Sequence, residues 1–381
     1  MFIAASGFAQ WTALSSGTTK WLFSVYFTTP NTGYAVGDSG KILKTSNAGA
    51  NWISQASGTT YTLWSIYFIN IDTGYAVGDH GKILKTSNGG TNWITQTSGI
   101  GNHLFSVFFT NSNTGYAVGD SGKILKTNNG GTNWTQQTSG ITHQLNSVFF
   151  TDANTGYTVG AGTILKTIDG GASWTMQTSG TFLYSVYFTN SDTGYISSGG
   201  GIILKTINGG INWTAQTIET NTWLSSVYFP DANTGFAVGG YNSVSGGVIY
   251  KTTDGGTSWI AQTSGTMNDL VSVYFTDANT GYAVGFIGTI LKTTNGGEFV
   301  EENQLQESAI NIFPNPTNNN LTIETTEKAT IEILNTQGQI IKTINTADKQ
   351  TSIDVSNLSS GVYIIKAKTE SGMAVKKFIK E

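Results

Sequence analysis

The chain has 381 residues and contains neither arginine nor cysteine, so all 19 of its basic residues are lysines. Without arginine, no site can bind a substrate carboxylate through the bidentate hydrogen bonds of a guanidinium group, a geometry that lysine does not reproduce. The net charge of −4, without a basic cluster, argues against nucleic-acid binding. The lack of cysteine excludes disulfides, thiol nucleophiles and thiolate metal sites.

Long apolar runs are missing as well. No stretch approaches the ~18 apolar residues that a membrane-spanning helix requires. Only 11% of the residues are charged, while Asn, Thr, Ser and Gly are abundant, which suits a secreted surface protein. We expect no membrane span and no cofactor.

What the chain does contain is a repeat of about 40 residues. One tryptophan recurs at the end of each repeat, at spacings of 41, 41, 41, 40, 39 and 46 residues. These tryptophans are Trp11, Trp52, Trp93, Trp134, Trp174, Trp213 and Trp259. A Gly-Tyr or Gly-Phe step also occurs seven times. Repeats of this length indicate the blades of a propeller.

Each repeat is predicted to form four short strands, for example residues 24–27, 34–36, 41–45 and 51–55. β-Branched and aromatic residues dominate these segments, and the breaks between them hold the Gly, Asn, Asp and Pro that turns need. Four antiparallel strands joined by tight turns make one blade. A blade cannot bury both of its apolar faces alone, so the blades must stack around an axis.

The phase of the repeat predicts how the ring closes. Trp11 precedes the first complete unit, whereas the last unit supplies three strands and no Trp. We therefore predict that residues 10–14 pair as the outer strand of the last blade, which removes the open sheet edges. The expected fold of residues 10–299 is an all-β, seven-bladed β-propeller closed by the N-terminal strand.

The turn before each outer strand carries a recognisable motif. Asp169 with Trp174, and Asp254 with Trp259, fit the Asp-box pattern Ser/Thr-x-Asp-x-Gly-x-x-Trp, and four other repeats have Asn in place of Asp. Together with the Gly-Tyr-Ala-Val-Gly element, this resembles the propeller family of the photosystem II stability and assembly factors and, more broadly, the BNR-like repeats. The resemblance implies that the boxes hold the turn and pack the Trp. Sialidase activity is not expected, because arginine is absent.

Comparison of the repeats with one another shows which rim varies. Loops between first and second strands are near copies, whereas the segments that enter the inner strands differ, and these share one rim with the second-to-third-strand connections. Aromatic side chains beside Asn, Asp and His are typical of surfaces that bind sugars or protein loops. The candidate ligand-binding residues are Trp21, Trp64, His103, His143, Tyr184, Trp223 and Asp269. The alternative is that these aromatics cap the blade cores.

Two further interpretations of this rim stay open. His103 and His143 occupy similar places in neighbouring repeats and could share a metal or ligand, or be plain exposed loop histidines; we expect no metal site. Asp38, Asp79 and Asp120 lie at equivalent turns of adjacent repeats and form the acidic set of an alternative function, an extracellular glycoside hydrolase. Against it, each lies in a Gly-Asp-x-Gly turn, where Asp is favoured for local hydrogen bonding.

After Phe299 the repeat ends, and an acidic linker (residues 300–308) leads to a second domain (309–381). Short alternating strands are expected there, which indicates a small immunoglobulin-like β-sandwich. They cover residues 310–313, 321–324, 330–334, 339–342, 351–355, 361–366 and 374–379.

Four ordered motifs in this domain carry a second resemblance: residues 313–316, 335–339, 358–363 and the Lys-rich end 376–380. They resemble the type A C-terminal sorting domain of the type IX secretion system. This implies the secretion machinery as a partner, and a product that is released or held at the outer-membrane surface of a Gram-negative bacterium of the Bacteroidota type. The alternative is an ordinary immunoglobulin-like module.

The amino terminus agrees with export, because residues 1–9 are apolar and small and are interpreted as the remnant of a signal peptide. The resulting hypothesis is a monomeric, secreted or cell-surface propeller without catalytic residues. It binds an unidentified extracellular glycan or protein through one loop face.

Overall fold

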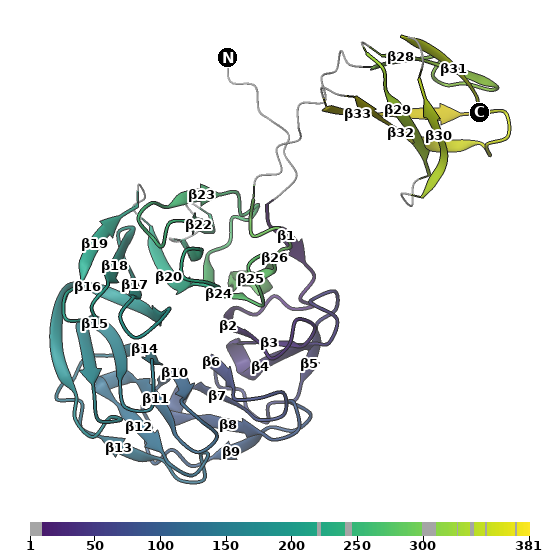
Figure 1. The fold of residues 1–381 in the computed structure, drawn as a ribbon. Helices are drawn as coiled ribbons and strands as arrows, with labels where there is room; N and C mark the ends of the chain where they lie inside the picture. The colour runs from purple at the N-terminus through teal and green to yellow at the C-terminus, as the bar shows by residue number, and fades with distance from the viewer. Residues whose placement is uncertain are drawn as a thin grey trace. The chain divides into compact units, whose positions relative to one another are not determined.

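The computed structural model describes residues 10–218, 222–240, 246–298, 310–325, 327–335, 339–346, 349–369 and 372–381. The described residues are predominantly strands and belong to two compact units, one covering residues 10–298 and one covering 310–381 (Figure 1). The expected signal-peptide remnant and the acidic linker lie outside the described residues.

In the first unit each repeat supplies antiparallel strands that pair in chain order. In the first complete repeat, β2 (Leu22–Phe27), β3 (Gly33–Gly37), β4 (Lys41–Thr45) and β5 (Ile53–Gln55) form the sheet β2-β3-β4-β5. The same order recurs in three further sheets: β6 (Leu63–Phe68), β7 (Gly74–Gly78), β8 (Ile83–Thr86), β9 (Ile94–Gln96); β10 (Leu104–Phe109), β11 (Gly115–Gly119), β12 (Ile124–Thr127), β13 (Thr135–Gln137); and β20 (Trp223–Tyr228), β21 (Gly235–Gly240), β22 (Val248–Thr252), β23 (Ile260–Gln262).

Two consecutive repeats share one six-stranded sheet. Its strands are β14 (Leu145–Phe150), β15 (Gly156–Thr167), β16 (Thr175–Phe188), β17 (Gly194–Ser198), β18 (Ile202–Thr206) and β19 (Thr214–Thr217). Here Gly160-Ala161-Gly162 replaces the Gly-Asp-x-Gly turn, so β15 runs on without a break and pairs Ala161 with Phe182 of β16. As a result β16 is the outer strand of one repeat and the inner strand of the next.

The predicted pairing of the amino-terminal strand with the last repeat is confirmed. β1 (Thr12–Leu14) pairs with β26 (Ile290–Thr293) and completes a sheet with β25 (Gly281–Gly285) and β24 (Leu270–Phe275). In Figure 1 the purple β1 lies beside the green β26. Trp11 is 1% exposed, and its ring centroid lies 5.8 Å from that of Phe275 and 6.2 Å from that of Phe236.

Neighbouring repeats contact each other through stacked aromatic rings. Phe27, at the end of an inner strand, stacks on Tyr282 of the preceding repeat at 4.0 Å. Gly33 precedes the tyrosine of its own repeat, and a Cβ there would lie 2.5 Å from the Phe27 ring, so only glycine fits. Equivalent pairs, 3.8–4.2 Å apart, are Tyr34–Phe68, Tyr75–Phe109, Tyr116–Phe150, Tyr157–Phe188, Tyr195–Phe229 and Phe236–Phe275.

The same tyrosines join each repeat to the box turn of the next. Tyr34 Oη and Lys44 Nζ both donate to the carbonyl of Gly89, at 2.8 and 2.6 Å. The pattern recurs at Gly130, Gly170, Gly209, Gly255 and Ala48. Six of the lysines thus have a structural role between repeats.

A collar of inner-strand aromatics surrounds the axis of the ring. Each ring contacts the next at centroid distances of 5.0–5.4 Å, in the order Tyr26, Tyr67, Phe108, Phe149, Tyr187, Tyr228, Tyr274 and back to Tyr26. The tyrosines donate to carbonyls of the following repeat, as Tyr274 does to Phe27 O at 3.0 Å. Burial raises the pKa of Tyr67 and Tyr187 to about 12, so the collar stays neutral.

The Asp-boxes are turns stabilised from within. Asp169 Oδ1 accepts from Thr167 Oγ1 at 2.8 Å and from the Ser173 backbone N–H at 2.9 Å. Asn88 accepts the equivalent pair of hydrogen bonds at 3.0 and 2.9 Å. Because one side-chain oxygen is enough for both bonds, Asn can replace Asp at this position. The box tryptophans Trp174 and Trp259 pack edge-on against the inner-strand phenylalanine of their own repeat, at 6.1 and 5.9 Å.

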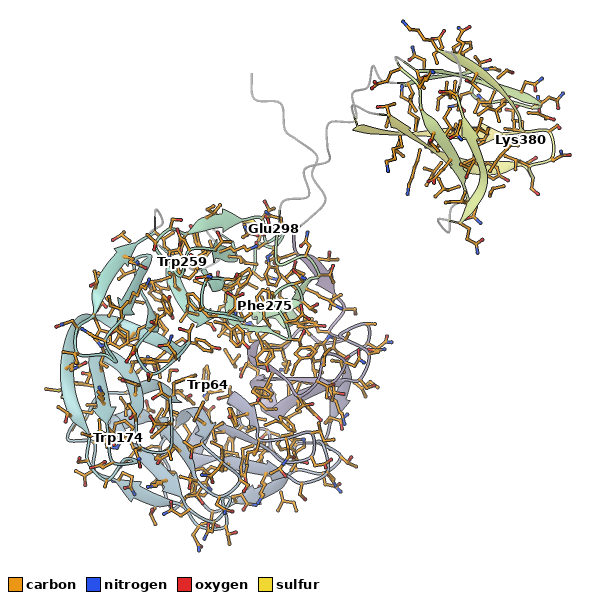
Figure 2. All side chains as sticks on the ribbon, viewed as in Figure 1. Trp64, Trp174, Trp259, Phe275, Glu298 and Lys380 are labelled. Atoms are coloured by element: carbon orange, nitrogen blue, oxygen red, sulfur yellow. The ribbon has the colours of Figure 1, made fainter. Side chains whose placement is uncertain are left out.

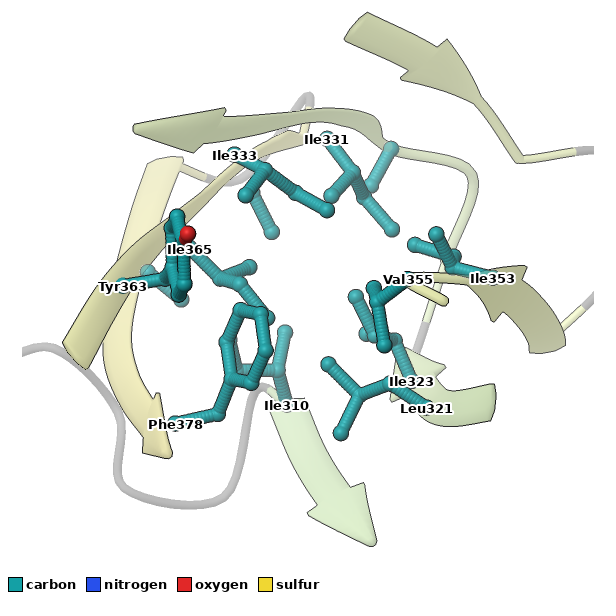
Figure 3. Packing of buried hydrophobic residues seen from close by; sticks show 13 residues of the cluster. Ile310, Leu321, Ile323, Ile331, Ile333, Ile353, Val355, Tyr363, Ile365 and Phe378 are labelled. Carbon is teal, nitrogen blue, oxygen red and sulfur yellow. The ribbon is translucent and has the colours of Figure 1, made fainter. Parts of the chain in front are cut away.

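The second unit consists of two sheets around one core. The strands of one sheet, in order, are β27 (Ile310–Phe313), β28 (Asn320–Thr325) and β31 (Gln350–Asp354); those of the other are β30 (Ile340–Asn345), β29 (Thr330–Leu334), β32 (Gly361–Thr369) and β33 (Gly372–Lys380). Ile323 and Ile353 of the first sheet face Ile333, Ile365 and Phe378 of the second (Figure 3). The strands match the predicted segments closely, and the immunoglobulin-like class stays a prediction.

Ring closure generates the first prediction. Removing residues 10–15 deletes β1 and the Trp11 side chain, whose truncation alone should cost about 3–5 kcal/mol. We expect the melting temperature of the first unit to fall by on the order of 10 °C, measured by scanning calorimetry. Ile53→Ser, at an exposed outer-strand position, is the control. A deletion variant as stable as the parent would contradict this role of β1.

The boxes generate the second prediction. Hydrogen bonds from the Ser173 side chain and backbone lower the pKa of Asp169 to about 2, and Ser258 likewise holds the pKa of Asp254 below its usual range. A lowered folded-state pKa adds stability above the unfolded value, near 4, that is lost as the pH falls. Asp169→Asn with Asp254→Asn should therefore flatten the decline in melting temperature between pH 4 and pH 2. Parallel curves for the variant and the parent would exclude this contribution.

Candidate functional site

The two sets of variable loops lie at one end of the strands. The backbone N–H of Asp38, at the start of a second-to-third-strand connection, donates to the carbonyl of Trp21, just before the inner strand, at 2.9 Å. The equivalent bond joins Asp120 to His103 at 3.0 Å. The two variable loops of each of these repeats are thus adjacent, and we call the end of the strands that carries them the variable face.

Four connections on this face are short 3-10 turns: η1 (Asp38–Gly40), η2 (Asp79–Gly81), η3 (Asp120–Gly122) and η4 (Phe286–Gly288). The residue at the tip of each turn has a left-handed backbone although it is not glycine. The tips are Ser39, His80, Ser121 and Ile287, with φ between 53° and 56°. Ile287 is the most unfavourable of them, because β-branched residues avoid this region.

An aromatic series crosses the face from the last repeat to the third. Trp21 stacks on Phe286 at 3.9 Å with the ring planes 10° apart, and Trp21 is 42% exposed. Phe23 lies 6.4 Å from Trp21 and 4.2 Å from Trp64, which in turn contacts Phe105 at 5.6 Å. The side chain of Trp64 lies toward the middle of the ring (Figure 2).

Carboxylates and imidazoles adjoin this series. Trp64 Nε1 donates to Asp79 Oδ1 at 2.7 Å, and His103 Nδ1 lies 2.8 Å from the same oxygen. On its other side His103 Nε2 lies 4.0 Å from Asp120 Oδ2. The His80 ring meets His103 edge-on at 5.4 Å. The structure therefore brings together Trp64, Asp79, His103 and Asp120 of the predicted candidates.

The local hydrogen bonding expected for the Gly-Asp-x-Gly turns is wrong. Among the described residues, no backbone N–H donates to the carboxylates of Asp38, Asp79 or Asp120; the turns close through backbone bonds such as Lys82 N–H to Asp79 O at 3.1 Å. By contrast, Asp152 on the opposite rim accepts two backbone N–H groups at 2.7 and 2.9 Å. The acidic set is therefore not required by the turns that carry it.

The lysines next to these aspartates are directed elsewhere. Lys41 Nζ donates to Ser54 Oγ at 3.3 Å, and Lys123 Nζ donates to Gln136 Oε1 at 3.1 Å. Lys82 Nζ lies 5.6 Å from the ring centroid of Tyr61. Within the described ranges, no lysine forms an ion pair with the acidic set.

The remaining candidates lie apart from this cluster. Trp223 is 45% exposed, and its ring lies 6.1 Å from Tyr184. Asp269 is buried, with only 8% exposed, so its assignment to an open rim is not supported. His143 is exposed, and among the described residues no ring contact joins it to His103. The two histidines therefore do not form the shared site considered above.

Sequence reasoning missed Phe23, Phe286 and Ile287. Alignment of the repeats holds the signal for two of them, because Phe286-Ile287 replaces the Asp-Ser or Asp-His of the other turns. Among the described residues no three His, Asp or Glu side chains are placed to hold a metal ion. None of the described helices is long and apolar enough to cross a membrane.

The comparisons with known proteins begin with the second unit. Residues 311–381 match the family described as the secretion system C-terminal sorting domain. This domain directs export to the cell surface or the medium of a Gram-negative bacterium, so the chain is secreted or held at the outer-membrane surface. No curated protein matches the sequence.

Several solved structures share the fold of the first unit. YCF48 from Cyanidioschyzon merolae is 22% identical, with a TM-score of 0.62 over 74% of this chain and 98% of that one. YCF48 bound to D1 peptide is 17% identical, with a TM-score of 0.65 over 77% and 100%. A GH74 xyloglucanase from Xanthomonas campestris is 14% identical, with a TM-score of 0.63 over 83% and 59%. These likenesses show a propeller-like fold.

The repeats themselves identify the family. Its description is photosynthesis system II assembly factor YCF48, and it matches four overlapping segments, residues 3–98, 56–138, 93–175 and 136–272. Together they span residues 3–272, well over half of the chain. The chain therefore belongs to the YCF48 family of BNR-repeat propellers and carries a type IX sorting domain at its carboxyl end.

Proposed function

We propose that this protein binds an extracellular glycan or protein through its variable face and has no catalytic activity of its own. The observation that carries the proposal is the continuous array of Trp21, Phe23, Trp64, Asp79 and His103 on that face. Flat aromatic rings provide a large contact area at low entropic cost, and neighbouring polar groups give orientation.

The finer architecture belongs to this proposal. A seven-bladed ring is supported by the closed collar of seven aromatic side chains and by the pairing of β1 with β26. Residues 10–299 would form the binding domain, 300–308 a linker and 309–381 an immunoglobulin-like sorting domain, in a chain that acts as a monomer.

The likenesses fit a binding role. One structure with the same fold is YCF48 bound to a peptide, so such a ring can present a peptide-binding surface. The photosystem role of that family does not follow for this chain, because its sorting domain directs it out of the cell.

Replacement of Trp21, Trp64 and Trp223 by alanine tests the proposal. We expect at least a tenfold loss of binding to whatever ligand the full-length protein captures on a glycan array or from extracellular proteins, because the face loses three indole rings. Met176→Ala, at an exposed outer-strand position, is the control. Unchanged binding by a folded triple variant would reject the variable face as the binding site.

A glycoside hydrolase is the alternative, supported by the likeness to a xyloglucanase and by the carboxylates of Asp79 and Asp120 on either side of His103. Two carboxylates across a cleft, about 5–9.5 Å apart, are the requirement of such enzymes. The two side chains are 20% and 31% exposed, so neither lies in the apolar pocket that sets a general acid apart from its partner.

We therefore expect the full-length protein to release no reducing sugar from xyloglucan or from other plant and microbial polysaccharides. Asp79→Asn and Asp120→Asn are the diagnostic variants. Hydrolysis by the parent that either substitution lowers a hundredfold or more would establish the enzyme and overturn the assignment as a binding protein.

A further inference from the structure

We infer that the variable face binds a polypeptide segment in which an apolar side chain lies close to a lysine or arginine. The inference rests on the function proposed above and names the class of partner for the same face. It is carried by two neighbouring features, a partly exposed apolar step where the last repeat meets the first complete one, and carboxylates without a lysine partner on the first three.

The apolar step consists of Trp21, Phe286 and Ile287. Phe286 covers one face of the Trp21 indole, yet Trp21 stays 42% exposed and Ile287 56% exposed. In the three equivalent turns the tip residue is Ser39, His80 or Ser121. An isoleucine at this point is less than half buried and is held in a backbone region that β-branched residues avoid. Folding of the chain therefore gives no reason for Ile287, whereas contact with a partner does.

The charged side consists of Asp38, Asp79 and Asp120. Among the described residues their carboxylates contact only the Trp64 indole and the His103 ring, and no lysine ammonium neutralises them. Their turns do not need them, as the backbone bonds show. Negative charge beside the open faces of aromatic rings attracts a cation both through the carboxylates and through the rings themselves.

This combination favours a polypeptide over a sugar. Carboxylates can accept hydrogen bonds from the hydroxyls of a neutral glycan, but only a cationic group also gains from their negative charge, and an anionic glycan or acidic peptide is repelled by it. Ile287 and Phe286 offer no hydrogen bonds to sugar hydroxyls, but they are suited to an apolar side chain that anchors an interface. A basic residue beside that anchor would lie over the acidic turns.

The test uses the full-length protein and an immobilised library of twelve-residue peptides. Each peptide carries one Leu, Ile or Phe and two Lys or Arg at varied spacings, and each has a partner in which Glu replaces the basic residues. We expect basic peptides to bind at least tenfold more tightly than their Glu partners. Affinity for the best peptide, measured by calorimetry, should fall as salt rises from 50 to 500 mM, because the attraction is partly electrostatic.

Two double variants separate the features. Trp21→Ala with Ile287→Ser should weaken the best peptide at least tenfold for basic and Glu versions alike. Asp79→Asn with Asp120→Asn keeps an acceptor for Trp64 and should weaken only the basic version, by tenfold or more. The matched controls are Ile53→Ser, an exposed isoleucine on β5, and Asp192→Asn on the opposite rim; both should bind like the parent.

Equal binding of basic and Glu peptides, an unchanged affinity in the Asp79 and Asp120 variant, or no peptide bound above background would each overturn the inference. A glycan ligand that is lost on Trp21→Ala, with no peptide bound, would leave the proposed function standing and reject only the polypeptide. Ligand binding that none of the face variants alters would reject both. Melting temperatures within a few degrees of the parent confirm that the variants are folded.

Discussion

The stacking of an inner-strand phenylalanine on the tyrosine of the preceding repeat is the contact on which the ring depends. Phe27 on Tyr282 illustrates it, with Gly33 leaving room for the phenyl ring. One tyrosine thus covers the core of the next repeat with its ring and bonds the next box turn with its hydroxyl. Because every repeat needs a neighbour on both sides, a linear array would leave two faces uncovered. The pairing of β1 with β26 avoids that cost.

This arrangement assigns different tasks to the two rims. On the box rim many polar groups have a structural role: Asp169 holds its turn, Asp152 accepts backbone N–H groups, and Lys44 binds the carbonyl of Gly89. Such a rim tolerates little change, which is why its loops are near copies. On the variable face each 3-10 turn is closed by the same backbone bond, so Asp79 and Phe286 occupy equivalent positions without changing the fold.

The features that could be predicted from the sequence are those that recur with the repeat. The repeat period predicted the positions of the strands. The incomplete units at both ends predicted the pairing of Thr12–Leu14 with the last repeat. The bonding of Asp79 could not be predicted, since a Gly-Asp-x-Gly turn is compatible with a carboxylate that holds the turn or one that points away from it. The contact of His103 with Asp79 could not be predicted either. It joins two neighbouring repeats and depends on the orientation of both side chains, which the sequence pattern does not specify. Alignment of the turns would have drawn attention to Phe286-Ile287, which puts two large apolar residues where η1, η2 and η3 have polar ones.

Repeats within one chain therefore offer an internal standard for separating structure from function. A residue that recurs and has a bonded partner, such as Tyr34 or Lys44, is explained by the contacts between repeats. A residue that departs from its equivalents and has no such partner needs another explanation. Ile287 departs most strongly, since its left-handed backbone is unfavourable for a β-branched residue and its 56% exposed side chain recovers little of that cost through burial. Beside it, the exposed Trp21 stacks on the half-buried Phe286, and the acidic turns follow along the ring. The binding role proposed for this face would account for these departures together, whereas the contacts that join the repeats do not require Ile287 or the acidic set.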